Sequence, residues 1–109
     1  MKEIKAFIRE RKTNTVIEEL RRAGFYSLTV SEAEGTGKYT KKEDMPSLRF
    51  PVTHSKVSKL EIVCEDEEVD PIVKIIHHHG RSGEKGDGLI YVSEIIKVFD
   101  VSTGLENKD

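Results

Sequence analysis

The chain has 109 residues, of which 36% are hydrophobic and 35% charged, and its 18 basic and 20 acidic residues give a formal net charge of -2. This length suits one domain, and the balanced charge gives no electrostatic reason to expect nucleic acid or an anionic membrane as a partner. The sequence has no apolar run that could span a bilayer and no recognisable secretory signal, so we expect no direct membrane insertion. The single cysteine, Cys64, excludes an internal disulfide and fits a reducing compartment, which favours a cytoplasmic protein.

The first third of the sequence predicts a strand, a helix and a second strand. Residues 1–9 alternate between apolar and charged side chains, which indicates a half-buried strand. Apolar residues with helical spacing follow. Thr15 and Glu18 have the separation of a capping box, and Gly24 stands where a glycine commonly ends a helix. Residues 25–34 alternate again and predict the second strand.

A long segment without a sustained apolar period lies between the two halves of the sequence. It holds two glycines and two prolines between residues 35 and 55. A loop of this length in a small domain is uncommon and usually functional, so we expect residues 37–55 to form a mobile loop. Its side chains suit docking to a partner protein, although the apolar ones could equally pack back on the domain. The candidate partner-binding residues are Lys41, Lys42, Met45, Leu48, Arg49 and Phe50.

The second half repeats the order of the first. Residues 56–64 alternate and predict a third strand, and a helical stripe then begins close to Pro71, because proline is tolerated only in the first turn of a helix. Residues 80–88 predict a glycine-rich turn, residues 89–92 a short strand and residues 95–101 a final short element.

Two strand–helix–strand halves predict an α+β, ferredoxin-like (βαβ-βαβ) sandwich, with a four-stranded antiparallel sheet and two helices on one face. We expect residues 1–104 to form this single domain and residues 105–109 to form a flexible tail. The uncovered face of the sheet would carry apolar side chains such as Phe7 and Val63. Packing of three copies into a homotrimer would cover that face.

Five blocks of the sequence resemble the PII signal-transduction (nitrogen regulatory protein P-II) family, in order and over nearly the whole chain. Residues 81–92, RSGEKGDGLIYV, are similar to the family signature T-G-x-x-G-D-G-K-I-F-V. Residues 24–38 are similar to G-x-x-G-[ML]-T-V-[TS]-E-x-x-G-x-G-R, and residues 59–63 to K-[IV]-E-[IV]-V. Residues 1–9 and 102–104 resemble two further blocks. A lone G-D-G is a weak signal, whereas five blocks in register are a strong one.

The resemblance implies a homotrimer that binds an adenine nucleotide in a cleft between each pair of subunits. It also implies the residues of that cleft. One wall would hold Leu28, Thr29, Glu61, Ile62 and Val63, and the neighbouring subunit would bring Gly35, Gly37, Lys38, Gly86, Asp87 and Gly88. Glycines allow backbone N–H groups to approach phosphate oxygens closely. The alternative is that Gly86 and Gly88 serve only a tight turn.

Several phosphate-binding cations of the family have no counterpart in this sequence. Their positions carry Leu89, Asp100 and Ser102, and a family arginine is replaced by Lys38, which lacks the fork that grips phosphate with two hydrogen bonds. Each charge-assisted hydrogen bond is worth roughly 1.5–3 kcal/mol. We therefore expect AMP and ADP to be favoured over ATP as the effector, with AMP first.

A metal-responsive ferredoxin-like trimer is the alternative function. His77, His78 and His79 are consecutive near the end of the expected second helix, whereas chelation on a helix needs a spacing of three or four residues. The helix dipole also favours histidines at this position. We expect no metal site within one chain, although trimer mates or His54 could complete one.

We expect a regulator and no catalytic activity. The sequence shows no positioned nucleophile and base, and Cys64 fits a small core residue. The resemblance implies that effector binding orders or releases the loop and so regulates a partner transporter or enzyme. Gly37 and Lys38 would couple the two events, because both belong to the cleft and to the base of the loop.

Overall fold

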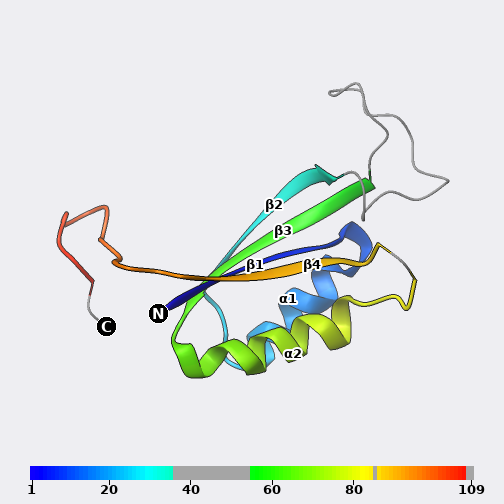
Figure 1. Ribbon diagram of the computed structural model, residues 1–109, viewed down its shortest axis with the longest axis horizontal. Coiled ribbons are helices and arrows are strands. Elements are labelled where there is room, and N and C mark those ends of the chain that lie inside the picture. Colours follow the sequence, from blue (N-terminus) through cyan, green and yellow to red (C-terminus); the bar gives the residue numbers. More distant parts are fainter. Residues whose placement is uncertain (36–54, 85, 108–109) are drawn as a thin grey trace.

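The computed structural model describes residues 1–35, 55–84 and 86–107, which form a sheet with two helices on one face (Figure 1). The strands are β1 (Lys2–Arg9), β2 (Leu28–Gly35), β3 (Ser55–Cys64) and β4 (Gly88–Glu94). The helices are α1 (Thr13–Arg22) and α2 (Val69–Gly80), and short 3-10 turns, η1 (Glu10–Lys12) and η3 (Asp66–Glu68), precede them. The sheet order is β2-β3-β1-β4 with antiparallel neighbours throughout. The ferredoxin-like α+β prediction is therefore confirmed.

The core lies between the sheet and the two helices. β1 is a central strand, and its Ile4, Ala6 and Ile8 are buried on the helix side, as the alternation predicted. The rest of the core cluster comes mainly from β3 and the helices: Val16, Leu20, Leu60, Ile62, Cys64, Ile72 and Ile76. No described helix covers the opposite face of the sheet (Figure 1).

The start of α1 differs from the predicted capping box. The helix begins at Thr13, and no side chain caps its N-terminus, so Thr15 and Glu18 lie inside it. The reason is that η1 leads directly into the helix and supplies its first turn. The hydroxyl of Thr13 instead hydrogen-bonds the hydroxyl of Ser58, which ties the helix start to β3.

The end of α1 agrees with the prediction. Gly24 has a φ of 96°, and its N–H donates to the carbonyl of Arg21 at 2.9 Å. The N–H of Phe25 donates to the carbonyl of Leu20 at 2.9 Å, which completes a glycine-based helix stop. Because Phe25 belongs to this stop, β2 begins at Leu28, later than the predicted strand.

α2 begins close to Pro71 as predicted, with this proline as its third residue. The acidic η3 precedes it and carries a capping box, in which the N–H of Glu65 donates to a carboxylate oxygen of Glu68 at 2.9 Å. Gly80, predicted as part of the following turn, is the buried last residue of α2. A Cβ added at Gly80 would lie 3.4 Å from Cγ2 of Ile8 on β1, which is ordinary van der Waals contact.

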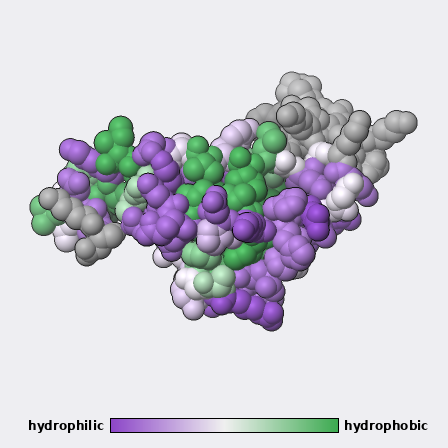
Figure 2. Space-filling view, turned by 60° about the horizontal axis from the view of Figure 1, so that its bottom comes forward, coloured by the Kyte–Doolittle hydropathy of each residue, from purple (hydrophilic) through white to green (hydrophobic). Residues whose placement is uncertain are grey.

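The described residues after β4, 95–107, form no regular helix or strand, so the final short element predicted at residues 95–101 is not formed. The chain runs past the start of β1, so no further residue of β1 is left to pair with it, and one bridge between Phe99 and Glu106 closes a small loop. Figure 2 shows hydrophobic side chains on this end of the molecule, at left, where Ile96 is 91% exposed. The predicted flexible tail at 105–109 stays a prediction.

Candidate functional site

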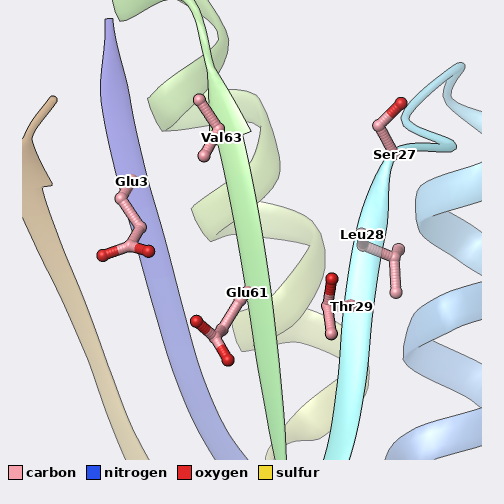
Figure 3. A pocket seen from close by; sticks show the side chains of 6 residues that line it. All are labelled: Glu3, Ser27, Leu28, Thr29, Glu61 and Val63. Atoms are coloured by element: carbon pink, nitrogen blue, oxygen red, sulfur yellow. The ribbon is translucent and has the colours of Figure 1, made fainter. Parts of the chain in front are cut away.

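A shallow hollow of about 450 Å³ lies on the sheet at the start of β2. It is lined by residues of β1, β2 and β3 and of the turn before β2, as Figure 3 shows: Glu3, Ser27, Leu28, Thr29, Glu61 and Val63. Four of these six were predicted as the wall of a ligand cleft. The structure therefore brings Leu28, Thr29, Glu61 and Val63 together.

The wall residues do not all face the same way. Thr29 pairs with Glu61 across β2 and β3, on the sheet face that the helices leave uncovered, and Leu28 pairs with Ile62 on the helix face. Ile62 is 3% exposed and belongs to the core. Its side chain is therefore occupied by packing, and only its backbone can contribute to a ligand site.

The hollow has an acidic lining that nearby lysines partly balance. Both Glu3 and Glu61 line it (Figure 3), and each has a lysine neighbour on its own strand. The Nζ–Oε1 distance is 3.7 Å from Lys5 to Glu3 and 3.4 Å from Lys59 to Glu61. These pairs are partly exposed, so they contribute little to stability, but they leave the carboxylates available to accept hydrogen bonds from a ligand.

The second group of predicted site residues surrounds the glycine turn between α2 and β4. Asp87 is its centre. One carboxylate oxygen accepts from Nε of Arg9 at 3.1 Å and from the hydroxyl of Ser82, and the other accepts from the backbone N–H groups of Ser82 at 2.7 Å and Gly83 at 3.1 Å. Burial raises the pKa of this carboxyl, but the donors from Ser82, Arg9 and Gly83 outweigh burial and lower it to about 2. Asp87 is therefore ionised and holds the turn together.

The glycines of the turn have conformations that other residues rarely adopt. Gly86 and Gly88 have φ values of 81° and 122°. Gly88 also pairs with Ile8 at the point where β4 joins β1. Gly88 therefore has a definite role in the turn, whether or not a ligand also binds there.

The loop residues of the predicted site lie at or beyond the end of the described segment. Gly35 is the last residue of β2 and pairs with Ser55, which starts β3. Gly37 and Lys38 lie outside the described residues. So do the six predicted partner-binding residues, Lys41, Lys42, Met45, Leu48, Arg49 and Phe50.

The two groups of predicted residues lie at opposite ends of the sheet. Thr29 pairs with Glu61, and Glu61 pairs in turn with Lys5 of β1. Gly88 pairs with Ile8, three residues further along β1. These two positions on β1 are roughly 10 Å apart along the strand, and β2 and β4 are roughly 14 Å apart across the sheet. One copy of the chain therefore does not bring Thr29 to the glycine turn.

Two pairs of residues were not predicted. Glu3 and Ser27 line the hollow, and Arg9 and Ser82 bind Asp87. The alternation of residues 1–9 indicates which side chains share a face, but the partners of Glu3 and Arg9 depend on strand register. No local sequence signal specifies that register.

The histidines form a small group on α2. The rings of His78 and His79 meet edge to face with centroids 4.7 Å apart, and Nε2 of His79 lies 3.8 Å from Oε2 of Glu19 on α1. Within residues 1–35, 55–84 and 86–107, no three potential ligands are grouped to hold a metal ion. His54 lies outside these ranges, so the metal hypothesis for an assembly of several copies stays a hypothesis.

The fold and the glycine turn define a ferredoxin-like α+β domain. Comparison with known proteins shows to which family this domain belongs. The family model "Nitrogen regulatory protein P-II" matches residues 1–105. A protein of the same name from Microchaete diplosiphon is 36% identical over 110 aligned positions, covering 100% of this chain and 98% of the relative. The one from Pasteurella multocida is 34% identical with the same coverage. "Nitrogen regulatory protein P-II 2" from Methanothermobacter thermautotrophicus is 35% identical over 99% of this chain and 95% of the relative.

The chain belongs to the nitrogen regulatory protein P-II family. The resemblance identified from the five sequence blocks is confirmed, and with it the class of signal-transduction regulators. None of the described helices combines the length and the apolar character that crossing a membrane would require.

Proposed function

We propose that this chain is a trimeric, cytoplasmic regulator that binds an adenine nucleotide between subunits and signals occupancy to a partner transporter or enzyme. The observation that carries the proposal is the separation of the predicted ligand residues. Thr29 and Glu61 line a hollow at one end of the sheet, and Gly35 and Gly86 to Gly88 lie toward the other. A ring of copies packed head to tail would place one end of each sheet against the opposite end of its neighbour.

The loop provides the route from ligand to partner in this proposal. Gly35 and Ser55 pair at the ends of β2 and β3, so both ends of the segment between them start at the same corner of the sheet. A ligand bound at this corner would change the conformations open to residues 37–55. The partner would bind one set of those conformations better than the other.

We propose AMP first and ADP second as effectors, both ahead of ATP. The family's phosphate-binding positions carry Leu89, Asp100 and Ser102, which provide no cation. A carboxylate such as Asp100 at a phosphate-binding position would repel a polyphosphate. Titration calorimetry of the three nucleotides tests this ranking, and tight ATP binding with weak AMP binding would contradict it.

We expect the bound nucleotide to be released chemically unchanged, because the chain acts as a regulator and not as an enzyme. Membership in a family of regulatory proteins supports this expectation. The one thiol, Cys64, is buried, and burial raises its pKa, which makes it a poor nucleophile. Incubation with each nucleotide followed by chromatography would detect turnover, which would contradict this part of the proposal.

Two variants with opposite lesions test whether a cleft forms between copies. Thr29→Trp fills the hollow, and Gly86→Asp puts a negative charge on the turn, where aspartate tolerates a positive φ better than most residues. Thr29→Ser and Gly86→Asn are the matched controls. Each lesion alone should abolish nucleotide binding, while each control should largely retain it.

Mixing the two lesion variants by unfolding and refolding them together gives the decisive result. If each cleft takes its wall from one copy and its turn from the next, random trimers should regain about a quarter of their clefts. A site within a single copy would regain none. Native mass spectrometry of the same sample reads the subunit count, and a stable monomer would refute the trimer directly.

A further inference from the structure

The carboxylate of Asp87 receives four hydrogen bonds from groups that would suit any small oxyanion. Its donors are Nε of Arg9, the hydroxyl of Ser82 and the backbone N–H groups of Ser82 and Gly83. The three nitrogen donors lie 2.7 to 3.1 Å from the carboxylate oxygens. Two consecutive backbone N–H groups that converge on one acceptor are the arrangement by which proteins bind carboxylate and phosphate oxygens. An adjacent guanidinium group adds a positive charge.

These donors come from distant parts of the chain and meet in a sheltered place. Arg9 ends β1, whereas Ser82 and Gly83 follow α2, and the side chain of Arg9 is 9% exposed. Gly83 has a φ of 88°, which turns its backbone toward the carboxylate. The donors from the end of β1 and from the turn after α2 therefore form a pre-arranged anion-binding site, here called the cradle.

We propose that Arg9, Ser82 and Gly83 form an oxyanion site that the chain fills with its own Asp87. Asp87 acts as a tethered anion, present at very high effective concentration, so it excludes free carboxylate or phosphate. The low pKa of Asp87 keeps this internal ligand ionised throughout the physiological range. A phosphate group can use these donors only by displacing Asp87.

This inference also bears on the effector, and that extension rests on the proposed function. If the cradle is already filled, the turn offers fewer donors to a polyphosphate, in keeping with a preference for AMP. Emptying the cradle should then raise affinity for ATP more than affinity for AMP. The test of the cradle itself uses no nucleotide, so the two proposals can fail separately.

Chemical rescue tests the cradle. Asp87→Ala removes the internal anion and leaves its donors in place. Formate, and inorganic phosphate as a second probe, should raise the melting temperature of this variant in a saturable way, in excess of sodium chloride at equal ionic strength. Wild type and Asp70→Ala, which removes an exposed carboxylate on α2, should respond to formate and to chloride alike. No saturable excess in Asp87→Ala would overturn the proposal.

Two further variants separate a cradle from a merely structural ion pair. Adding Ser82→Ala to Asp87→Ala should reduce formate rescue at least about tenfold in apparent affinity, because one hydroxyl donor is lost. Unchanged rescue would place the anion elsewhere and overturn the assignment. If Asp87→Ala does not fold, Asp87→Asn replaces it. Phosphate should then shift the amide resonances of Ser82 and Gly83 saturably in Asp87→Asn and not in wild type, and equal behaviour of the two proteins would refute the site.

Discussion

A Cβ atom placed on Gly88 would lie 1.7 Å from the carbonyl oxygen of Phe7 and 2.8 Å from its carbonyl carbon. No rotation of a side chain can relieve such a contact, because both atoms of Phe7 belong to the backbone of a central strand. Gly88 is therefore the point at which the glycine turn becomes β4, and any other residue there would push β4 away from β1.

Gly88→Ala should destabilise the fold strongly, by at least about 3 kcal/mol, since it combines a backbone clash with an unfavourable φ. Gly83→Ala is the matched control. Gly83 also has a positive φ, but nothing lies within 4 Å of its Cβ position, so it should cost only about 1 kcal/mol. Urea denaturation of both variants measures the difference. Similar losses would mean that strain in φ, and not contact with Phe7, sets the cost.

Stability should depend on pH through Asp87. Its pKa is about 2 in the folded chain against an ordinary value of 3.8, so the ionised carboxylate stabilises the fold fully above pH 3.8 and this contribution is lost as the pH falls toward 2. This difference in pKa corresponds to about 2 kcal/mol in the free energy of unfolding.

Asp87→Asn should therefore be less stable than wild type by about 2 kcal/mol at neutral pH, and the gap should close as the pH approaches 2. Urea titrations across this range measure the gap. Asp70→Asn provides an exposed comparison on α2. A gap that stays constant with pH would show that the charge of Asp87 is not responsible.

The capping box before α2 predicts a difference between two neighbouring acids. Glu68 accepts the N–H of Glu65, whereas Glu67 is exposed in the same turn and has no part in the box. Glu68→Ala should cost about 1 kcal/mol, and Glu67→Ala a few tenths of a kcal/mol, since both lose a similar interaction with the helix dipole. Thermal melts of the two variants measure the difference in stability. Equal losses would mean that only the interaction with the helix dipole contributes and that the capping box does not.

Cys64 should react slowly with thiol reagents in the folded protein. Burial raises the pKa of this thiol, and the carboxylates of Glu68 and Glu65 raise it further. At neutral pH we expect a reaction with an aromatic disulfide at least about tenfold slower than in urea-unfolded chain. Cys64→Ser serves as the blank. Equal rates in the two states would contradict the buried position on β3.

The local elements could be predicted because their signals are short in range. Alternation in residues 1–9 and 56–64 identified β1 and β3 and their inward faces, and Gly24 correctly marked the end of α1. The predicted cap at Thr15 was wrong because η1 leads into the helix and starts it earlier, at Thr13. No residue within the helix indicates this earlier start. The final short element predicted at residues 95–101 is not a regular helix or strand, because this segment has no partner strand beyond one bridge between Phe99 and Glu106.

The sequence by itself determined the fold class and the family, because strand alternation, helix stripes and motif order are all properties of neighbouring residues. The tertiary structure alone decided which distant residues meet. Arg9 and Asp87 are 78 positions apart, and their contact depends on the register of β1 with β4. The same register sets the two halves of the candidate site at opposite ends of the sheet, since pairing is a property of two strands together and is encoded in neither one.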